Sequence, residues 1–257
     1  MLLLHGLLDT GASWERVAAG LPEYRVIAPD ARGHGRSDHV GPGAAYHFAD
    51  YVRDLDALVE ELGGPVHLVG HSMGGTIASM YAGLVPDQVR SLCLVEGIGP
   101  PTEPDAAAVD RFRAHLDQMR APPQPKVMAT IPDAVERLVR VNRGLSPEEA
   151  QRIARRNTRK VPSGWIWTWD PLHRTRSPIG FDVDRYLGML KQIVAPTRVV
   201  LCSESWYLGV DRLQERIDAC SAERVELPGG HTPHLDQTDA LVSVIRSTIQ
   251  SANSCIE

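Results

Sequence analysis

The sequence of 257 residues has the balance of a soluble globular protein, with 43% hydrophobic and 23% charged residues. This length suits one large domain with a sizeable core, and a formal net charge of −5 gives no basis for nucleic-acid binding. No apolar run is long enough to cross a membrane, and the opening run 1–4 is too short for a signal-peptide core. We therefore expect a cytoplasmic protein with no membrane partner.

The N-terminal part alternates short apolar runs with amphipathic segments. Residues 2–4 and 25–30 are apolar runs that predict two buried strands, and residues 11–21 between them predict a first helix. A polar, glycine-rich loop over 32–38 follows the second strand. Apolar residues recur at steps of three and four over 46–62, so this stretch is expected to form an amphipathic helix.

Residues 66–84 join an apolar strand pattern directly to a helix pattern, with the motif Gly-His-Ser-Met-Gly at 70–74 between them. A strand that reverses into a helix within so few residues holds the serine at a strained backbone angle with its hydroxyl exposed. The glycines leave room where strand and helix nearly touch. The motif alone also occurs in ordinary turns, but this setting predicts a nucleophile elbow at Ser72.

The C-terminal half continues the alternation of strands and helices. Further strands are predicted at 89–95, 196–202 and 224–227, and a last helix at 238–249. Nearly continuous apolar strands separated by helices indicate a parallel sheet covered on both faces. Prolines and charged helices characterise 100–191. We therefore predict an α/β core formed by 1–99 and 192–257, with 100–191 inserted as a helical lid.

The predicted lid has a local excess of positive charge. From Ser146 to Arg176 there are seven Lys and Arg residues against three acidic residues, although the whole chain is negative. Two interpretations stay open: the charge steers an anionic substrate or an acidic carrier protein, or it covers a solvated helix face. Trp165, Trp167 and Trp169 alternate along an extended segment, which favours packing inside the lid over lining an acyl pocket.

Four short motifs occur in order along the chain, namely His5-Gly6, Asp30-x-Arg32-Gly33-His34-Gly35-x-Ser37, Gly70-His71-Ser72-Met73-Gly74-Gly75 and Gly229-Gly230-His231. Through these motifs the chain resembles the α/β-hydrolase superfamily over nearly its whole length. The resemblance implies a mostly parallel sheet with helices on both faces and a serine hydrolase activity. The family usually has two further strands before the first motif, which this sequence does not contain. Within the family, the chain resembles serine-hydrolase-like proteins and chain-releasing polyketide thioesterases with a glutamate in the triad.

A serine nucleophile needs a base within hydrogen-bond reach. His231 follows a predicted strand through a Pro-Gly-Gly turn, which can carry an imidazole over the carboxyl edge of the sheet. His234, three residues later, is the competing candidate. Because His234 matches a family position that often packs structurally, we assign the base to His231.

An acidic residue must orient this histidine. In the family it usually follows the strand at 198–202, where this chain has Ser205 in place of the expected aspartate. Glu96 ends the preceding strand, and a buried carboxylate there needs a partner. Haloalkane dehalogenases and some polyketide chain-releasing thioesterases have a catalytic glutamate at the equivalent strand end, so the resemblance assigns the acid to Glu96. Glu204 is the alternative acid, and a salt bridge from Glu96 to a lid arginine also stays open.

Two backbone N–H groups are expected to bind the oxyanion. One belongs to Met73, directly after the nucleophile, and the resemblance gives the other to Leu7, directly after the first motif. The sequence has no dinucleotide-binding motif, and its four cysteines lack metal-ligand spacing. No cofactor or metal is therefore expected.

Together these assignments predict a serine hydrolase that cleaves a carboxylic ester or thioester through an acyl-serine intermediate. The position of Glu96 and the basic lid favour a thioesterase that releases a polyketide-like acyl chain, from a small substrate or from an acyl carrier protein. Two alternatives stay open. One is a carbon–carbon bond hydrolase of the meta-cleavage type, in which lid arginines hold a diketo acid. The other is a non-catalytic hydrolase-fold receptor, which the substituted Ser205 would fit.

Overall fold

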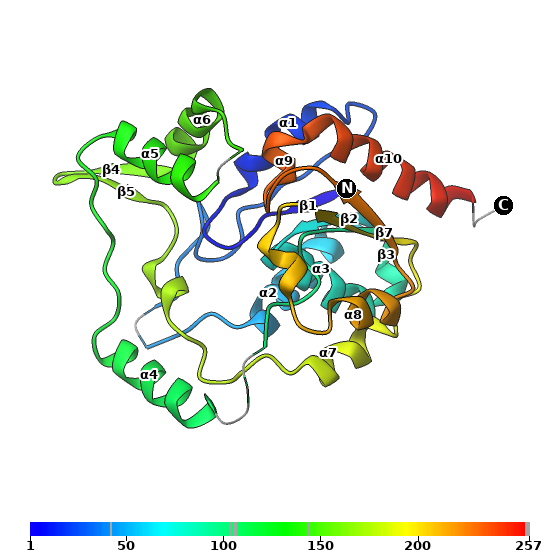
Figure 1. Cartoon of the computed structure of the whole chain (residues 1–257), viewed down its shortest axis with the longest axis horizontal. Helices are drawn as coiled ribbons and strands as arrows, with labels where there is room; N and C mark the ends of the chain where they lie inside the picture. Colours follow the sequence, from blue (N-terminus) through cyan, green and yellow to red (C-terminus); the bar gives the residue numbers. More distant parts are fainter. Residues whose placement is uncertain (42, 103, 105–106, 143, 255–257) are drawn as a thin grey trace.

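The computed structural model describes residues 1–254 except 42, 103, 105, 106 and 143, so Cys255 lies outside the described residues (Figure 1). The centre of the protein is a parallel five-stranded sheet in the order β1-β2-β3-β6-β7. The strands are β1 Leu2–Leu4, β2 Val66–His71, β3 Val89–Val95, β6 Thr197–Cys202 and β7 Glu223–Leu227. Parallel neighbours require crossover connections over the faces of the sheet, which explains the surrounding helices. The predicted α/β fold is confirmed.

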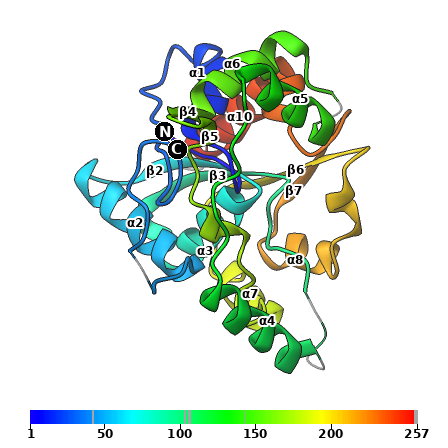
Figure 2. The same cartoon turned by 90° about the vertical axis from the view of Figure 1, so that its left-hand side faces the viewer.

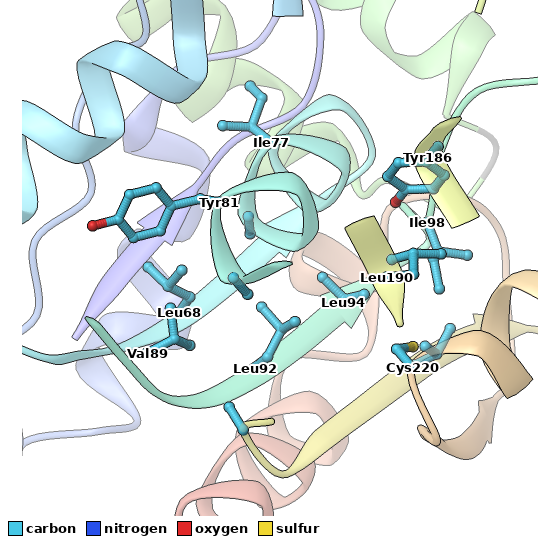
Figure 3. Packing of buried hydrophobic residues seen from close by; sticks show 14 of the residues in the cluster. Leu68, Ile77, Tyr81, Val89, Leu92, Leu94, Ile98, Tyr186, Leu190 and Cys220 are labelled. Carbon is cyan, nitrogen blue, oxygen red and sulfur yellow. The ribbon is translucent and has the colours of Figure 1, made fainter. Parts of the chain in front are cut away.

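Two hydrophobic cores form because successive side chains of a strand point to opposite faces of the sheet. On one face, Leu68, Leu92 and Leu94 of the strands pack against Ile77 and Tyr81 of the following helix, as Figure 3 shows. This core includes residues of β1, β2, β3 and β6 and holds the helix after Ser72 in place.

Helices cover both faces. The first face is covered by α2 Phe48–Glu61, α3 Met73–Leu84, α7 Val183–Leu190 and α8 Leu213–Ala219. The second face is covered by α1 Glu15–Ala19 and α10 Thr238–Ser254, with α9 Pro233–Asp236 beside them. Short 3₁₀ helices are η1 Gly11–Trp14, η2 Pro86–Gln88, η4 Pro171–Arg174 and η5 Trp206–Gly209. Among the described residues, no helix combines the length and the apolar character needed to span a bilayer.

The segment 25–30 differs from the prediction of a buried strand. Ile27 makes one isolated bridge to Leu2, supported by hydrogen bonds from Leu3 N to Ile27 O (2.9 Å) and from Ile27 N to Met1 O (3.0 Å). Its residues are partly buried or exposed, and Pro29 has no N–H with which to extend the pairing. The prediction is wrong because the segment pairs only with the short β1, at the edge of the sheet.

The segment between β3 and β6 adds helices and a hairpin to the core. Its elements are α4 Ala108–Arg120, α5 Ile131–Val141, α6 Pro147–Asn157, β4 Thr158–Val161 and β5 Gly164–Trp167, followed by η4 and α7. Figures 1 and 2 show α5, α6 and the antiparallel β4–β5 hairpin on one side of the molecule, with α4 apart from them. Helix α7 lies within the range 100–191 that was predicted to form the lid. It nevertheless packs against α3 and belongs to the hydrophobic core on the first face of the sheet.

The aromatic segment packs within this inserted part. Trp165 and Trp167 contact a small cluster that contains Met128, Ala134 and Ala154. Trp165 and Trp167 thus pack within the inserted segment as predicted, and Trp169 stacks on Trp167 with ring centroids 6.5 Å apart.

Candidate active site

Ser72 lies between β2 and α3 in a strained conformation, with φ of 50°. This conformation is possible because the strand and the helix touch at their glycines. A Cβ on Gly70 would lie 2.4 Å from the carbonyl oxygen of Gly74. The serine therefore has the geometry of a nucleophile elbow, beside the positive N-terminal end of α3.

His231 connects Ser72 to Glu96. Its Nε2 lies 3.1 Å from Ser72 Oγ, and its Nδ1 lies 3.0 Å from Glu96 Oε2. The loop after β7 carries this histidine through Gly229, whose φ of 92° suits glycine. Burial lowers the pKa of His71 well below its ordinary value, and its Nε2 donates to the backbone oxygen of His231 at 2.7 Å. The residue before Ser72 thus holds the loop that carries His231.

Glu96 is fully buried at the end of β3, in the left-handed region with φ of 52°. Its Oε1 accepts a hydrogen bond from Cys202 N (2.5 Å), and its Oε2 accepts one from Ser205 Oγ as well as facing His231. All three partners belong to β6, β7 or the loops that follow them. The hydrogen-bond partners of this carboxylate therefore all come from the sheet and the loops that follow its strands, and an arginine of the segment 100–191 is not among them.

The two alternative site residues lie elsewhere. The Glu204 side chain is exposed, and its backbone N donates to the oxygen of Gly229 at 3.0 Å. His234 is fully buried, with its ring 4.8 Å from that of Trp14 and its Nε2 3.7 Å from Asp9. Within the described residues, neither side chain is a hydrogen-bond partner of the predicted base.

Leu7 and Met73 both line the cavity that contains Ser72. Among the described residues, neither backbone N–H has a recorded hydrogen-bond partner, as a site for an oxyanion requires. The next residue, Leu8, has φ of 62° and donates its N–H to His34 Nε2 at 3.2 Å. Burial lowers the pKa of His34 to about 2, so this nitrogen remains an acceptor.

The cavity beside Ser72, here called the front cavity, has a volume of about 540 Å³. Its walls are largely aromatic and apolar, and they come from α2, η4, η5 and the loops around them. They include Tyr46, Phe48, Tyr51, Pro101, Leu172, Pro178, Trp206 and Tyr207. The front cavity therefore suits an apolar acyl group, and part of the segment 100–191 contributes to its wall.

The basic segment is partly neutralised within the structure. Arg152 pairs with Glu149 at 2.6 Å and with Glu15 at 2.5 Å, and Arg156 lies 3.9 Å from Glu15. Arg155 is exposed. Arg152 also donates to the backbone oxygen of Ala12 in η1 at 3.1 Å, so part of the positive charge fastens α6 to η1 and α1 of the core instead of facing a substrate. Among the described residues, no group of three or more His, Cys, Asp or Glu is arranged to hold a metal ion.

Some contributors to this geometry were not recognised in the sequence. Ser205 donates to Glu96, His71 holds the backbone of His231, and His34 holds the loop of Leu7. Only Ser205 had a signal, because it occupies the position where an aspartate was expected. The two histidines act on residues far away in the sequence, and no local pattern marks such contacts.

A parallel sheet with a strained serine at a strand-to-helix turn, and a histidine between that serine and a buried carboxylate, defines the α/β-hydrolase class of fold. The comparison with protein families agrees: a family model described as alpha/beta hydrolase fold matches residues 1–238. The chain belongs to this family.

Individual relatives give the same result. A serine hydrolase-like protein from Danio rerio is 30% identical, with 97% of this chain and 81% of that protein covered. A solved hypothetical protein from Pseudomonas aeruginosa PAO1 has a TM-score of 0.87 at 30% identity, covering 100% of this chain and 91% of the other. The solved thioesterase domain from the curacin biosynthetic pathway has a TM-score of 0.84 at 36% identity, covering 95% and 89% respectively.

Proposed function

We propose that this protein is a serine hydrolase that cleaves a carboxylic ester or thioester through an acyl-serine intermediate. The observation that carries this proposal is the unbroken chain of contacts from Ser72 Oγ through His231 to Glu96, with distances of 3.1 and 3.0 Å. This chain and the strained elbow support an enzyme over a non-catalytic binding protein.

The residues would act in a fixed order. His231 Nε2 takes the proton of Ser72 as Oγ attacks the carbonyl carbon, and the N–H groups of Leu7 and Met73 stabilise the oxyanion. The imidazolium, oriented by Glu96, then gives its proton to the leaving oxygen or sulfur. In the second half, His231 removes a proton from water, the hydroxide attacks the acyl-serine, and the acid is released with Ser72 restored.

Within this class, we propose a thioesterase that releases an extended acyl chain. Two observations support this choice: the identity of 36% with a solved thioesterase domain and the apolar character of the front cavity. A small acyl thioester is the simplest substrate. The acyl group could instead be carried as a thioester on an acyl carrier protein. Exposed basic residues such as Arg155, Arg159 and Lys160 would attract such an acidic protein electrostatically.

Labelling with a fluorophosphonate probe tests the reaction class. We expect the wild type to be labelled and the Ser72→Ala variant to remain unlabelled, with its fold verified by circular dichroism. A wild type that resists labelling would support the receptor alternative. Turnover of acyl-pantetheine thioesters, aryl esters and vinylogous diketo acids should then be compared. A clear preference for the diketo acid would overturn the proposal in favour of carbon–carbon bond cleavage.

A further inference from the structure

A second cavity of about 420 Å³ shares a lining residue, Tyr51, with the front cavity. We call it the rear cavity, and we define it by its apolar side chains Leu4, Leu55, Leu58 and Ile77 and by its polar lining residues, namely His5, Asp30, Arg32, Ser37, Asp38, His39 and Asp54. Arg32 and Asp54 bond to each other through two nitrogens and two oxygens, each pair at 2.5 Å. Asp30 accepts from the backbone N–H groups of Gly11 and Arg36, so these polar groups are engaged within the protein and the apolar side chains are the part of the lining suited to an alkyl chain.

The two cavities are neighbours along the same elements. On α2, Phe48 lines the front cavity, and Leu55 and Leu58 line the rear one. On α3, Thr76 lines the front cavity and Ile77 the rear one. Residues three, four and seven apart share one face of a helix, so 48, 51, 55 and 58 form one continuous stripe along α2. The stripe leads from the cavity of the nucleophile directly into the rear cavity.

Tyr51 lies at the junction of the two cavities. Of the described residues that line them, it alone belongs to both. Its side chain is only 6% exposed. Its ring stacks at 6.3 Å from Tyr46 and 6.5 Å from His173, and its hydroxyl lies 3.4 Å from His173 Nδ1. An aromatic ring held by its contacts with the stacked pair Tyr46 and His173 therefore borders both cavities.

The direction of the substrate follows from the proposed chemistry. His231 must protonate the leaving atom, so the leaving group lies on its side of Ser72, where the ring of Trp206 is 4.8 Å away. The acyl group then extends away from His231 into the front cavity, and we place its distal part against the α2 wall, which Phe48 and Tyr51 form.

We propose that Tyr51 sets the upper limit of acyl-chain length, and that the rear cavity is a latent subsite for the distal part of an unbranched aliphatic chain. This inference rests on the proposed hydrolase function. A chain that fills the front cavity meets the tyrosine ring. With a smaller residue at 51, each further methylene enters the rear cavity and loses contact with water, which raises kcat/KM about fourfold per methylene.

The test measures kcat/KM for p-nitrophenyl esters with linear acyl chains of increasing length. In the wild type we expect a decline beyond the length that reaches Tyr51. Tyr51→Leu and Tyr51→Ala should move that decline to longer chains, whereas Tyr51→Phe, which keeps the ring, should not. Adding Leu58→Phe to Tyr51→Leu refills the rear cavity and should return the decline to its wild-type position. Length profiles of Tyr51→Leu and the wild type that coincide would overturn the inference while leaving the hydrolase function intact.

A binding measurement separates the two proposals. In the Ser72→Ala background, calorimetric titration with sodium dodecanoate should show tighter binding to Tyr51→Leu than to the chain with Tyr51, while sodium butanoate should bind both equally. If the wild type hydrolyses no ester and resists the fluorophosphonate, the proposed function fails, and this titration still decides whether the rear cavity accepts an alkyl chain. Equal dodecanoate binding by both chains would refute the subsite.

Discussion

Replacing Glu96 by glutamine tests the proposed triad without changing the size of the side chain. The carboxylate faces three donors: the N–H of Cys202 on one oxygen, and Ser205 Oγ with His231 Nδ1 on the other. The backbone donor of Cys202 is fixed, so the glutamine oxygen must face it. The glutamine NH₂ group then faces His231, whose Nδ1 has to become an acceptor.

This change of partner forces the wrong tautomer. A neutral imidazole that accepts at Nδ1 carries its proton on Nε2, where it cannot take the proton of Ser72. The corresponding change of acid to amide in a Ser-His-Asp triad lowers kcat on the order of 10⁴-fold, or about 5 kcal/mol of activation free energy. We expect a loss of that size for Glu96→Gln, with little change in KM because the side chain is buried and does not line the front cavity.

The assay is steady-state hydrolysis of an aryl ester at pH 7, with thermal unfolding to verify the fold. Glu204→Gln is the matched control, because that side chain is exposed and is not bonded to His231. It should retain wild-type kcat. Loss of activity in the Glu204 variant alone would contradict the assignment of the acid to Glu96.

Four further changes have defined outcomes. Adding Ser205→Asp to Glu96→Gln returns a carboxylate beside the base, and kcat should recover at least about tenfold over the single variant; no recovery would contradict a shared acid position. Gly97→Ala places a Cβ 2.3 Å from the carbonyl oxygen of the nucleophile and should lower both stability and activity. Gly188 lies in α7, and a Cβ added there would have no atom within 4 Å. Gly188→Ala should therefore raise the free energy of unfolding by about 1 kcal/mol, and denaturant titration measures the stability of both glycine variants. Burial lowers the pKa of His173 to about 4, so its stabilising contribution is present above the ordinary pKa near 6.5 and is lost as pH falls toward 4. His173→Phe should therefore flatten the pH dependence of unfolding by up to about 3 kcal/mol between these values, and an unchanged slope would exclude this histidine as its source.

The local part of the site could be predicted from the sequence because its information is local. The glycines at 70 and 74 surround the serine in the sequence, and the same glycines form the contact between strand and helix in the structure. The strands formed by long apolar runs could be predicted for the same reason, because each run is continuous in the sequence. The run at 25–30 shows the limit, because whether an apolar run pairs fully depends on the length of its neighbour, here the three-residue β1.

The supporting contacts could not be predicted, because they join residues far apart. His71 and the backbone of His231 are separated by 160 positions, and His34 and Leu8 by 26. The role of Tyr51 depends on two cavities that exist only after α2 and α3 have packed. A single sequence records residue types and spacing, and neither determines which polar atoms meet in the folded protein.

The position of the acid shows how these two kinds of information combine. β3 and β6 are adjacent and parallel, so their carboxyl ends meet at the same edge of the sheet. Glu96 at the end of β3 and Ser205 after β6 consequently touch, and the Glu96 oxygen that accepts from Ser205 Oγ also faces Nδ1 of His231. Glu96, in the left-handed conformation, reaches the backbone N–H of Cys202 on the next strand. The requirement on a triad acid in this fold is thus that its carboxylate lies at this edge of the sheet beside the histidine. The ends of β3 and β6 both lie at this edge.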